Sequence, residues 1–407
     1  MKHITRKVPQ IRFKGFEGEW EDRPLGKLFP ITSAARVHKN EWTKSGVPFF
    51  RSSDVVSAFM GKVNTRAFIS HDLYLALSEK VGRVKKGDML VTGGGSIGIP
   101  YLVENDDPLY FKDADLLWFK IRDSVDSYYL FTFFSSQLFV RYVKSISHIG
   151  TIAHYTVEQA KITPIAVPKI ISEQTKIGEY FHGVDSLIRL QQRKYEKLVT
   201  LKKTMLQKMF PQAGTTTPEI RFKGFSREWA EKKLNQVGEF NPNEKLPEFF
   251  EYVDLESVIG TEMVSHRTET RKTAPSRAQR LARQGDLFFQ TVRPYQKNNY
   301  LFTLPFTDYV FSTGYAQIRP FDDGNFLLAL IQRDQFVKVV LDHCTGTSYP
   351  AINSNVLAEI LVSVPEPEEQ QKIGTYFRHL DELISKHAIQ LKKLKHIKSA
   401  CSAKMFP

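Results

Sequence analysis

Apolar residues recur at alternating intervals of three and four positions in two long segments of the chain. This spacing places them on one face of a helix and is typical of helices that pair through an apolar seam. One polar residue, Gln191 in the first seam and His387 in the second, falls near the middle of each. The apolar members are Phe181, Val184, Ile188, Tyr195 and Leu198 in the first segment, and Phe377, Leu380, Ile384, Leu391 and Leu394 in the second.

The ends of both segments carry helix-boundary signals. Val-Pro precedes each segment and Phe-Pro closes each one, and proline stops a helix from continuing. A helix over 173–209 would extend about 55 Å at a rise of ~1.5 Å per residue. Each helix could pack on its own half of the chain or on the other helix. The equal lengths and matching patterns favour packing on each other, with the nearby lysines flanking the seam.

The region before each helical segment consists of short β-rich runs separated by Gly, Pro and Asp. Examples are PFFRSSDVV and DADLLWFKI in the first half, and FEYVDLESV and YAQIRPF in the second. Helical stretches are expected at 128–145 and 325–341. Each half is therefore predicted to be an α+β globule of mixed α/β structure, followed by a long helix.

The two halves begin and end alike. Residues 11–28 align without gaps with 220–237, and half of the aligned positions are identical; 173–211 align in the same way with 369–407. The interiors share little beyond a Gly-Asp turn. Divergent interiors on a common frame suggest an internal repeat whose two domains recognise different things. The expected boundaries are a first domain at 1–168, a first helix at 169–211, a linker at 212–219, a second domain at 220–364 and a second helix at 365–407.

Charge and cysteine usage narrow the class of protein. The net charge is +13 and the pI is about 9.4, which favours a polyanionic partner, nucleic acid ahead of a membrane surface. A merely basic protein is the alternative. The two cysteines, Cys344 and Cys401, form no CxxC, so neither a zinc ribbon nor a disulfide scaffold is predicted. The absence of an apolar leader or of ~18 consecutive apolar residues predicts a cytoplasmic protein that does not span a membrane.

No motif in the sequence predicts catalysis or metal binding. GGGSIG at 93–98 satisfies two glycine-rich patterns, but IPYLV follows it, whereas a phosphate loop or a nucleophile elbow must open onto a helix. We interpret it as a turn between strands. There is no GK[ST] and no HExxH, and no proline is followed by proline or aspartate. The carboxylate pairs Asp106-Asp107, Asp322-Asp323 and Glu368-Glu369 are interpreted as turn or helix-start charges.

Basic residues cluster with polar and aromatic ones in both halves, as a DNA-binding face requires. Each residue alone could be a solvated surface charge. Arg277, Arg280 and Arg283 are expected on one short helix. In the first half the candidates are Arg36, His38, Lys39, Arg51, Ser52, Ser53, Lys62, Arg66, Gly94, Ser96 and Thr151. In the second half they are Arg271, Lys272, Arg277, Arg293, Tyr295, Gln296, Lys297, Asn298 and Thr347.

These motifs resemble those of the specificity subunit of type I restriction-modification systems. PQIRFKGFEGEW and PEIRFKGFSREW open the halves, KKGDMLVTGGGSIG and FSTGYAQIRPF resemble the family's middle motifs, and KMFP closes both halves. VPKIISEQTKIGEYF and VPEPEEQQKIGTYF resemble its helix starts. The resemblance covers nearly the whole chain, although VRPYQKN departs from the Gly/Ser-rich form that GGGSIG follows.

The resemblance implies a fold and a function. Two target-recognition domains would each read one half of a split duplex DNA sequence, and two long helices would pair antiparallel as a coiled coil with pseudo-twofold symmetry. The chain would bind no cofactor and would dock two methyltransferase subunits, which bind S-adenosylmethionine and methylate adenine. Motor nuclease subunits, which use ATP and Mg, would complete the restriction complex. The Gly-Asp turns and the loops at Gly150-Thr151 and Gly346-Thr347 are expected near DNA.

Two other functions stay open on the sequence. One is an enzyme, a nuclease or methyltransferase with an unrecognised active site. The other is a scaffold whose globules bind only protein.

Overall fold

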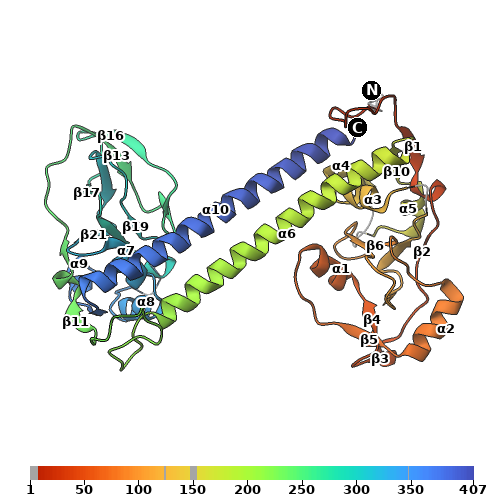
Figure 1. Ribbon diagram of the computed structural model, residues 1–407. Helices are drawn as coiled ribbons and strands as arrows, with labels where there is room; N and C mark the ends of the chain where they lie inside the picture. Colours follow the sequence, from red (N-terminus) through yellow and green to blue (C-terminus); the bar gives the residue numbers. More distant parts are fainter. Residues whose placement is uncertain (1–7, 123–124, 147–153, 347) are drawn as a thin grey trace. The chain divides into compact units, whose positions relative to one another are not determined.

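The structure is a computed structural model and describes residues 8–122, 125–146, 154–346 and 348–407 (Figure 1). The chain divides into two compact units. The first unit comprises residues 1–193 with 389–407, and the second comprises 194–388. Both long helices therefore contribute one part to each unit.

The first unit contains two four-stranded sheets and a two-stranded ribbon. The sheet orders are β2-β9-β6-β7 and β3-β5-β4-β8, and β1 pairs with β10. The strands are β1 (Glu21–Pro24), β2 (Ile31–Thr32), β3 (Trp42–Thr43), β4 (Val47–Phe50), β5 (Ala67–Ile69), β6 (Met89–Thr92), β7 (Pro100–Leu102), β8 (Tyr110–Phe111), β9 (Leu116–Phe119) and β10 (Pro164–Val167). The shorter helices are η1 (Leu25–Lys27), η2 (Lys39–Glu41), α1 (Ser52–Phe59), α2 (His71–Val81), α3 (Ser127–Phe134), α4 (Gln137–Ile146) and α5 (Val157–Ile162).

The second unit repeats this plan. Its four-stranded sheets have the orders β12-β21-β18-β19 and β16-β13-β20-β17, and β11 pairs with β22. The strands are β11 (Ala230–Lys233), β12 (Gly238–Phe240), β13 (Phe249–Val253), β14 (Val258–Ile259), β15 (Glu262–Met263), β16 (Arg267–Thr270), β17 (Ala278–Leu281), β18 (Leu287–Gln290), β19 (Tyr300–Leu301), β20 (Tyr309–Ser312), β21 (Tyr315–Pro320) and β22 (Leu361–Val364). The shorter helices are η3 (Leu234–Gln236), η4 (Pro294–Gln296), α7 (Gly324–Ile331), α8 (Asp334–Asp342) and α9 (Ser354–Ala358).

The strand after each Gly-Asp turn is an interior strand of a four-stranded sheet, and it is wholly buried. All four residues of β6 are buried, and successive side chains of a strand point to opposite faces. Met89 and Val91 accordingly join one apolar cluster, while Leu90 joins another with Trp118. The same alternation recurs in β18, where Phe288 faces a different cluster from its neighbours. An apolar run without polar alternation therefore marks a strand covered on both faces.

The two long helices are continuous, as the seam pattern predicted. They are α6 (Ile171–Lys208) and α10 (Pro367–Met405). In the first unit the Lys398 ammonium lies 2.7 Å from the Asp185 carboxylate, and the Tyr180 hydroxyl lies 3.4 Å from Cys401 Sγ. Later residues of α6 thus meet earlier residues of α10, which confirms antiparallel pairing within this unit.

The helical segments of the second unit pair in the same sense. Lys202 forms an ion pair of 2.5 Å with Asp381. Phe377 and Leu380 of α10 are buried in one cluster with Phe210, which follows the end of α6. The remaining seam residues are buried or half-buried in the described structure, namely Phe181, Val184, Ile188, Tyr195, Leu198, Ile384, Leu391 and Leu394.

Each closing KMFP motif packs on the opening motif of the other half of the sequence. In the first unit the Phe406 ring lies 6.3 Å from Trp20 and 5.4 Å from Tyr129. In the second unit Phe210 lies 5.7 Å from Trp229 and 5.5 Å from Phe326. The repeated sequence motifs therefore encode one repeated aromatic contact.

Buried ion pairs accompany these aromatic contacts. Arg12 holds Glu173 through two hydrogen bonds of 2.7 and 2.8 Å, and Arg221 holds Glu369 through two of 2.8 Å. Both carboxylates are almost completely buried. Glu369 lies in the first turn of α10, as expected, but our interpretation of it as a helix-start charge was incomplete, because its main partner is Arg221.

The expected helical stretches at 128–145 and 325–341 are each broken into two helices. In the first, the chain bends at Ser135-Ser136, where the Ser136 hydroxyl accepts the Phe139 N–H at 3.3 Å and so caps α4. In the second, Arg333 has extended backbone angles and donates to the Pro211 carbonyl at 2.9 Å. Among the described residues, no helix combines the length and the apolar content needed to cross a membrane.

Candidate DNA-binding surface

The glycine-rich segment at 93–98 forms the loop of a hairpin. It connects β6 to β7, which pair antiparallel, so the prediction of a turn between strands is confirmed. Gly94 is buried, whereas Ser96 is exposed, and its carbonyl accepts a hydrogen bond from the Thr92 hydroxyl. A Cβ at Gly93 would lie 2.7 Å from the Tyr155 carbonyl oxygen, so the backbone packs too closely there for any side chain.

Several first-half candidates surround the start of α1. Arg51 donates to Asp54 through Nε at 2.8 Å, and its Nη2 donates to the Thr65 carbonyl at 2.5 Å. The Ser52 hydroxyl donates to the Asp115 carbonyl at 3.1 Å, whereas Ser53 is exposed. Arg51 and Ser52 therefore hold the local backbone, and Ser53 is the candidate of this group that faces solvent.

The other first-half cations are exposed. Arg36 pairs with Asp113 at 3.0 Å, yet 70% of its side chain remains accessible. His38 and Lys39 lie at η2, and both are exposed. Lys62 and Arg66 belong to the loop between α1 and β5, and they line a cleft of about 220 Å³ together with Tyr101.

The second-half candidates at 293–298 build a loop around η4. Arg293 and Lys297 both have positive φ angles of 55°, which is uncommon for residues with a side chain. The Arg293 guanidinium lies 4.4 Å from the centre of the Tyr349 ring. Lys297 donates to the Gln332 carbonyl at 2.9 Å and pairs with Asp334 at 2.5 Å, which holds the pKa of that carboxyl below its ordinary value.

Some uncharged side chains of this loop form hydrogen bonds within the protein, and others are exposed to solvent. The Asn298 side-chain oxygen accepts the Gly260 N–H at 2.8 Å, and that of Gln296 accepts from Gln290 at 2.9 Å. Tyr295 is 49% exposed. Gln296 is also exposed, whereas Arg293 is half-buried against Tyr349, so Tyr295 is the member best placed to meet a ligand.

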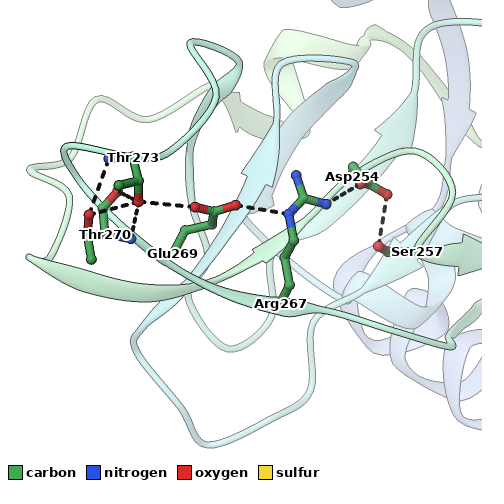
Figure 2. Close-up of polar contacts among 6 residues, drawn as sticks. All are labelled: Asp254, Ser257, Arg267, Glu269, Thr270 and Thr273. Atoms are coloured by element: carbon green, nitrogen blue, oxygen red, sulfur yellow. Dashed lines mark hydrogen bonds and ion pairs between the residues drawn. The ribbon is translucent and has the colours of Figure 1, made fainter.

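A chain of polar contacts fixes the turn that carries Arg271 and Lys272, two exposed candidates (Figure 2). Arg267 donates to Asp254 at 2.7 Å and to Glu269 at 3.0 Å. Thr273 extends the chain by donating to Glu269 at 3.2 Å.

The far end of this chain is also held, because Ser257 donates to Asp254 at 2.9 Å. Burial is the largest single influence on the pKa of Asp254 and would raise it, but the hydrogen bonds from Arg267, Ser257 and the Glu256 N–H together outweigh burial and hold that pKa below its ordinary value. Asp254 thus remains a charged partner of Arg267, and the network holds β16 and the following turn in place.

The expected helix at Arg277, Arg280 and Arg283 is wrong. Ala278–Leu281 form strand β17, which pairs with β20. Arg277 is exposed just before the strand. Burial lowers the pKa of Arg280, whose Nε has no hydrogen-bond partner among the described residues. Arg283 pairs with Glu244 at 2.5 Å. The spacing of three suggested a helix, but pairing with β20 in a sheet decided the structure.

Part of the candidate surface is not described. Thr151, Gly150 and Thr347 lie outside the described residues. Gly346 is exposed and has a φ of 85°. In the part of the chain that is described, no group of three or more His, Cys, Asp or Glu side chains could hold a metal ion.

The family model described as the type I restriction modification DNA specificity domain matches the chain twice, at residues 17–200 and 226–396. The two matches fall on the two halves of the repeat and together cover most of the chain. The chain belongs to this family.

Individual relatives of this specificity-domain protein share about a quarter of their residues with it over the matched segments. A putative type I restriction enzyme specificity subunit of Haemophilus influenzae is 25% identical over 184 residues, which are 42% of this chain and 45% of the relative. The type I restriction enzyme MjaIX specificity subunit of Methanocaldococcus jannaschii is 24% identical over 177 residues, 39% of each protein. The matched segments thus span less than half the length of these relatives.

The fold of the specificity-domain protein matches a solved structure along its whole length. The crystal structure of the type I restriction-modification system S subunit from M. genitalium superposes with a TM-score of 0.65 at 15% identity. The match covers 98% of this chain and 99% of that chain.

The specificity domains also depend on residues that were not among the candidates for DNA binding. Asp88 and Asp286 of the Gly-Asp turns are buried, so their carboxylates support the fold beneath the loops. Arg267 anchors the network in Figure 2. The sequence repeat could have indicated the Arg12–Glu173 ion pair, because both residues lie in segments that recur in the second half.

Proposed function

We propose that this chain is the DNA-recognition subunit of a type I restriction-modification complex and that each domain reads one half of a bipartite duplex target. The repeated frame is the observation that carries the proposal. The same ion pairs and aromatic contacts build both units, whereas the polar loops on them differ. Two different reading surfaces on one frame suit a target made of two unlike halves.

The positive charge supports duplex DNA as the ligand. The chain carries a net charge of +13, and neutralising phosphates releases counterions, which makes binding favourable and dependent on salt. Exposed candidates such as Lys39, Arg66, Lys272 and Arg277 are suited to phosphate or base contacts. Arg51 and Lys297 instead form contacts within the protein that hold nearby loops in place.

The long helices would set the gap between the two half-sites. α6 has 38 residues and α10 has 39, and each contributes to both units. A helix of this size extends about 57 Å, which corresponds to roughly 17 base pairs at ~3.4 Å per pair. Helices paired by ion pairs and an apolar seam would hold that spacing rigidly.

In this proposal the chain performs neither methylation nor cleavage itself. Two methyltransferase subunits, which supply S-adenosylmethionine, would dock on the shared frame and methylate adenine in the target. Motor nuclease subunits, with ATP and Mg, would join the same complex. The matched relatives, which are themselves specificity subunits, support this division of labour.

The test is to express the chain with its methyltransferase partner and to map N6-methyladenine across the cell's DNA. We expect methylation at one sequence with two specified halves and a fixed unspecified gap. The chain expressed alone should methylate nothing and should not retain S-adenosylmethionine. Methylation by the chain alone, or an undivided target, would contradict the proposal.

A further inference from the structure

The loop between α1 and β5, residues 60–66, carries cations beside a wholly exposed apolar side chain. Val63 has its full side-chain surface exposed, and Met60 is 62% exposed. Lys62 and Arg66 are exposed on either side of Val63, and neither forms an ion pair with any residue that the structure describes. Burying a valine side chain away from water lowers the free energy of the system. A loop tip of this kind is therefore suited to contact with a partner.

The base of this loop is held firmly. The Asn64 side-chain amide donates to Asp54 at 2.8 Å, and Arg51 links the same Asp54 to the Thr65 carbonyl. Gly61 has a φ of 68°, where a side chain would strain the backbone. Because the loop is already ordered, binding at its tip would lose little conformational entropy.

The chemistry of the tip is complementary to the edge of a DNA groove. Lys62 and Arg66 could each contact a phosphate, while Val63 between them contacts an apolar group on a base. The major groove is about 12 Å wide and admits a protein loop, and the thymine 5-methyl group is the apolar feature among its base edges. An acidic protein surface would pair with Lys62 and Arg66 but would offer no such partner to Val63.

We propose that loop 60–66 enters the major groove of one half-site, where Val63 packs on a thymine methyl group and Lys62 and Arg66 contact flanking phosphates. This inference rests on the proposed function and adds to it a specificity-determining residue. Val63 would make the first domain favour an A·T pair at one position, while the cations would add affinity without sequence preference.

The experiment uses the complex with methyltransferase subunits and duplexes that carry the mapped target. Each thymine of both halves is replaced in turn by deoxyuridine, which removes only the methyl group. One replacement, in one half, should weaken binding of the wild-type complex about fourfold, as expected for one buried methyl group. The Val63→Ala complex should bind thymine DNA about as weakly and should lose nothing further with deoxyuridine.

The cations are tested through salt dependence. Lys62→Ala and Arg66→Ala should each reduce the slope of log affinity against log salt by about one, whereas Val63→Ala should leave the slope unchanged. Lys80→Ala, at an exposed lysine of α2, is the matched control and should keep the slope. Equal unfolding midpoints would establish that the variants are folded.

The outcomes separate this inference from the proposed function. If the wild-type complex does not bind the mapped target selectively, the proposed function fails. If it binds, any of three results overturns the inference. The first is that deoxyuridine leaves the binding of the wild-type complex unchanged at every position. The second is that it weakens the wild-type and Val63→Ala complexes equally. The third is a mapped target in which neither half contains an A·T pair.

Discussion

Arg319 holds the buried carboxylate of Asp286 through two hydrogen bonds, from Nε at 2.8 Å and from Nη2 at 2.9 Å. Asp286 belongs to the Gly-Asp turn of the second unit. The corresponding Asp88 of the first unit is also buried, but it accepts the indole N–H of Trp118 at 2.9 Å instead. The same position is therefore an ion pair in one unit and a hydrogen bond in the other.

This difference predicts unequal effects of the same substitution. Asp286→Asn should destabilise the second unit by about 2 kcal/mol, because the Arg319 guanidinium loses its closest carboxylate and keeps only Glu244, at 3.0 Å. Asp88→Asn should cost about 1 kcal/mol or less, since an amide oxygen can still accept from Trp118. Urea unfolding of the two variants gives both values, and equal losses would contradict the account.

The pH dependence of the first unit should report on Asp88. Burial raises the pKa of this carboxyl above its ordinary value, so the folded state binds the proton more tightly than the unfolded state. The resulting stabilisation is complete below the unfolded pKa of about 3.9 and is lost as pH rises through the folded pKa.

The comparison is between wild type and Asp88→Asn, which cannot titrate at this position. Wild type should gain stability relative to the variant when the pH falls from 7 to about 4. Denaturant unfolding at several pH values measures this difference. A constant difference across that range would show that Asp88 titrates as it does in the unfolded chain.

The two closing phenylalanines should stabilise different units. Phe406→Ala should destabilise the first unit and Phe210→Ala the second, each by about 3–5 kcal/mol, as is typical for a buried phenylalanine. Hydrogen exchange should accelerate in the affected unit. Phe321→Ala is the control, because that ring is 64% exposed. Uniform acceleration in both units for either variant would contradict this assignment.

The network in Figure 2 should matter more than an ordinary surface ion pair. Arg267→Ala should destabilise the second unit by about 1 kcal/mol and increase hydrogen exchange at 270–273, because the variant disconnects Asp254 from Glu269. Arg378→Ala is the control, since Arg378 pairs with Glu382 on an exposed helix face. Equal responses of the two variants would mean that the network does not hold the turn.

The long helices and the repeated frame could be predicted because their signals are periodic or duplicated. The seam positions identify the buried face without reference to the rest of the chain. The recurrence of Trp20 as Trp229, and of KMFP at both exits, marked positions with a common role. The sequence could not show that each KMFP packs on the opening motif of the other half, since that contact depends on how the helices pair.

The candidate surface was less predictable because the contacts of its side chains depend on residues that are distant in the sequence. Arg280 lies in a strand, although its spacing from Arg277 and Arg283 suggested a helix; its pairing with β20 overrode the local pattern. Lys297 binds Asp334, which follows it by 37 residues, and nothing local indicates that contact. Val63 belongs to no chemical motif, and its exposure between two cations is evident only in the structure.

In the proposed function, the paired helices α6 and α10 fix the distance between two half-sites. Inserting one heptad into the middle of both α6 and α10 preserves the apolar seam and lengthens each helix by about 10 Å, roughly three base pairs. Mapping N6-methyladenine in cells that carry this variant with its methyltransferase should find the same two half-sites with a gap about three base pairs longer. An unchanged gap, or altered half-sites, would contradict the account.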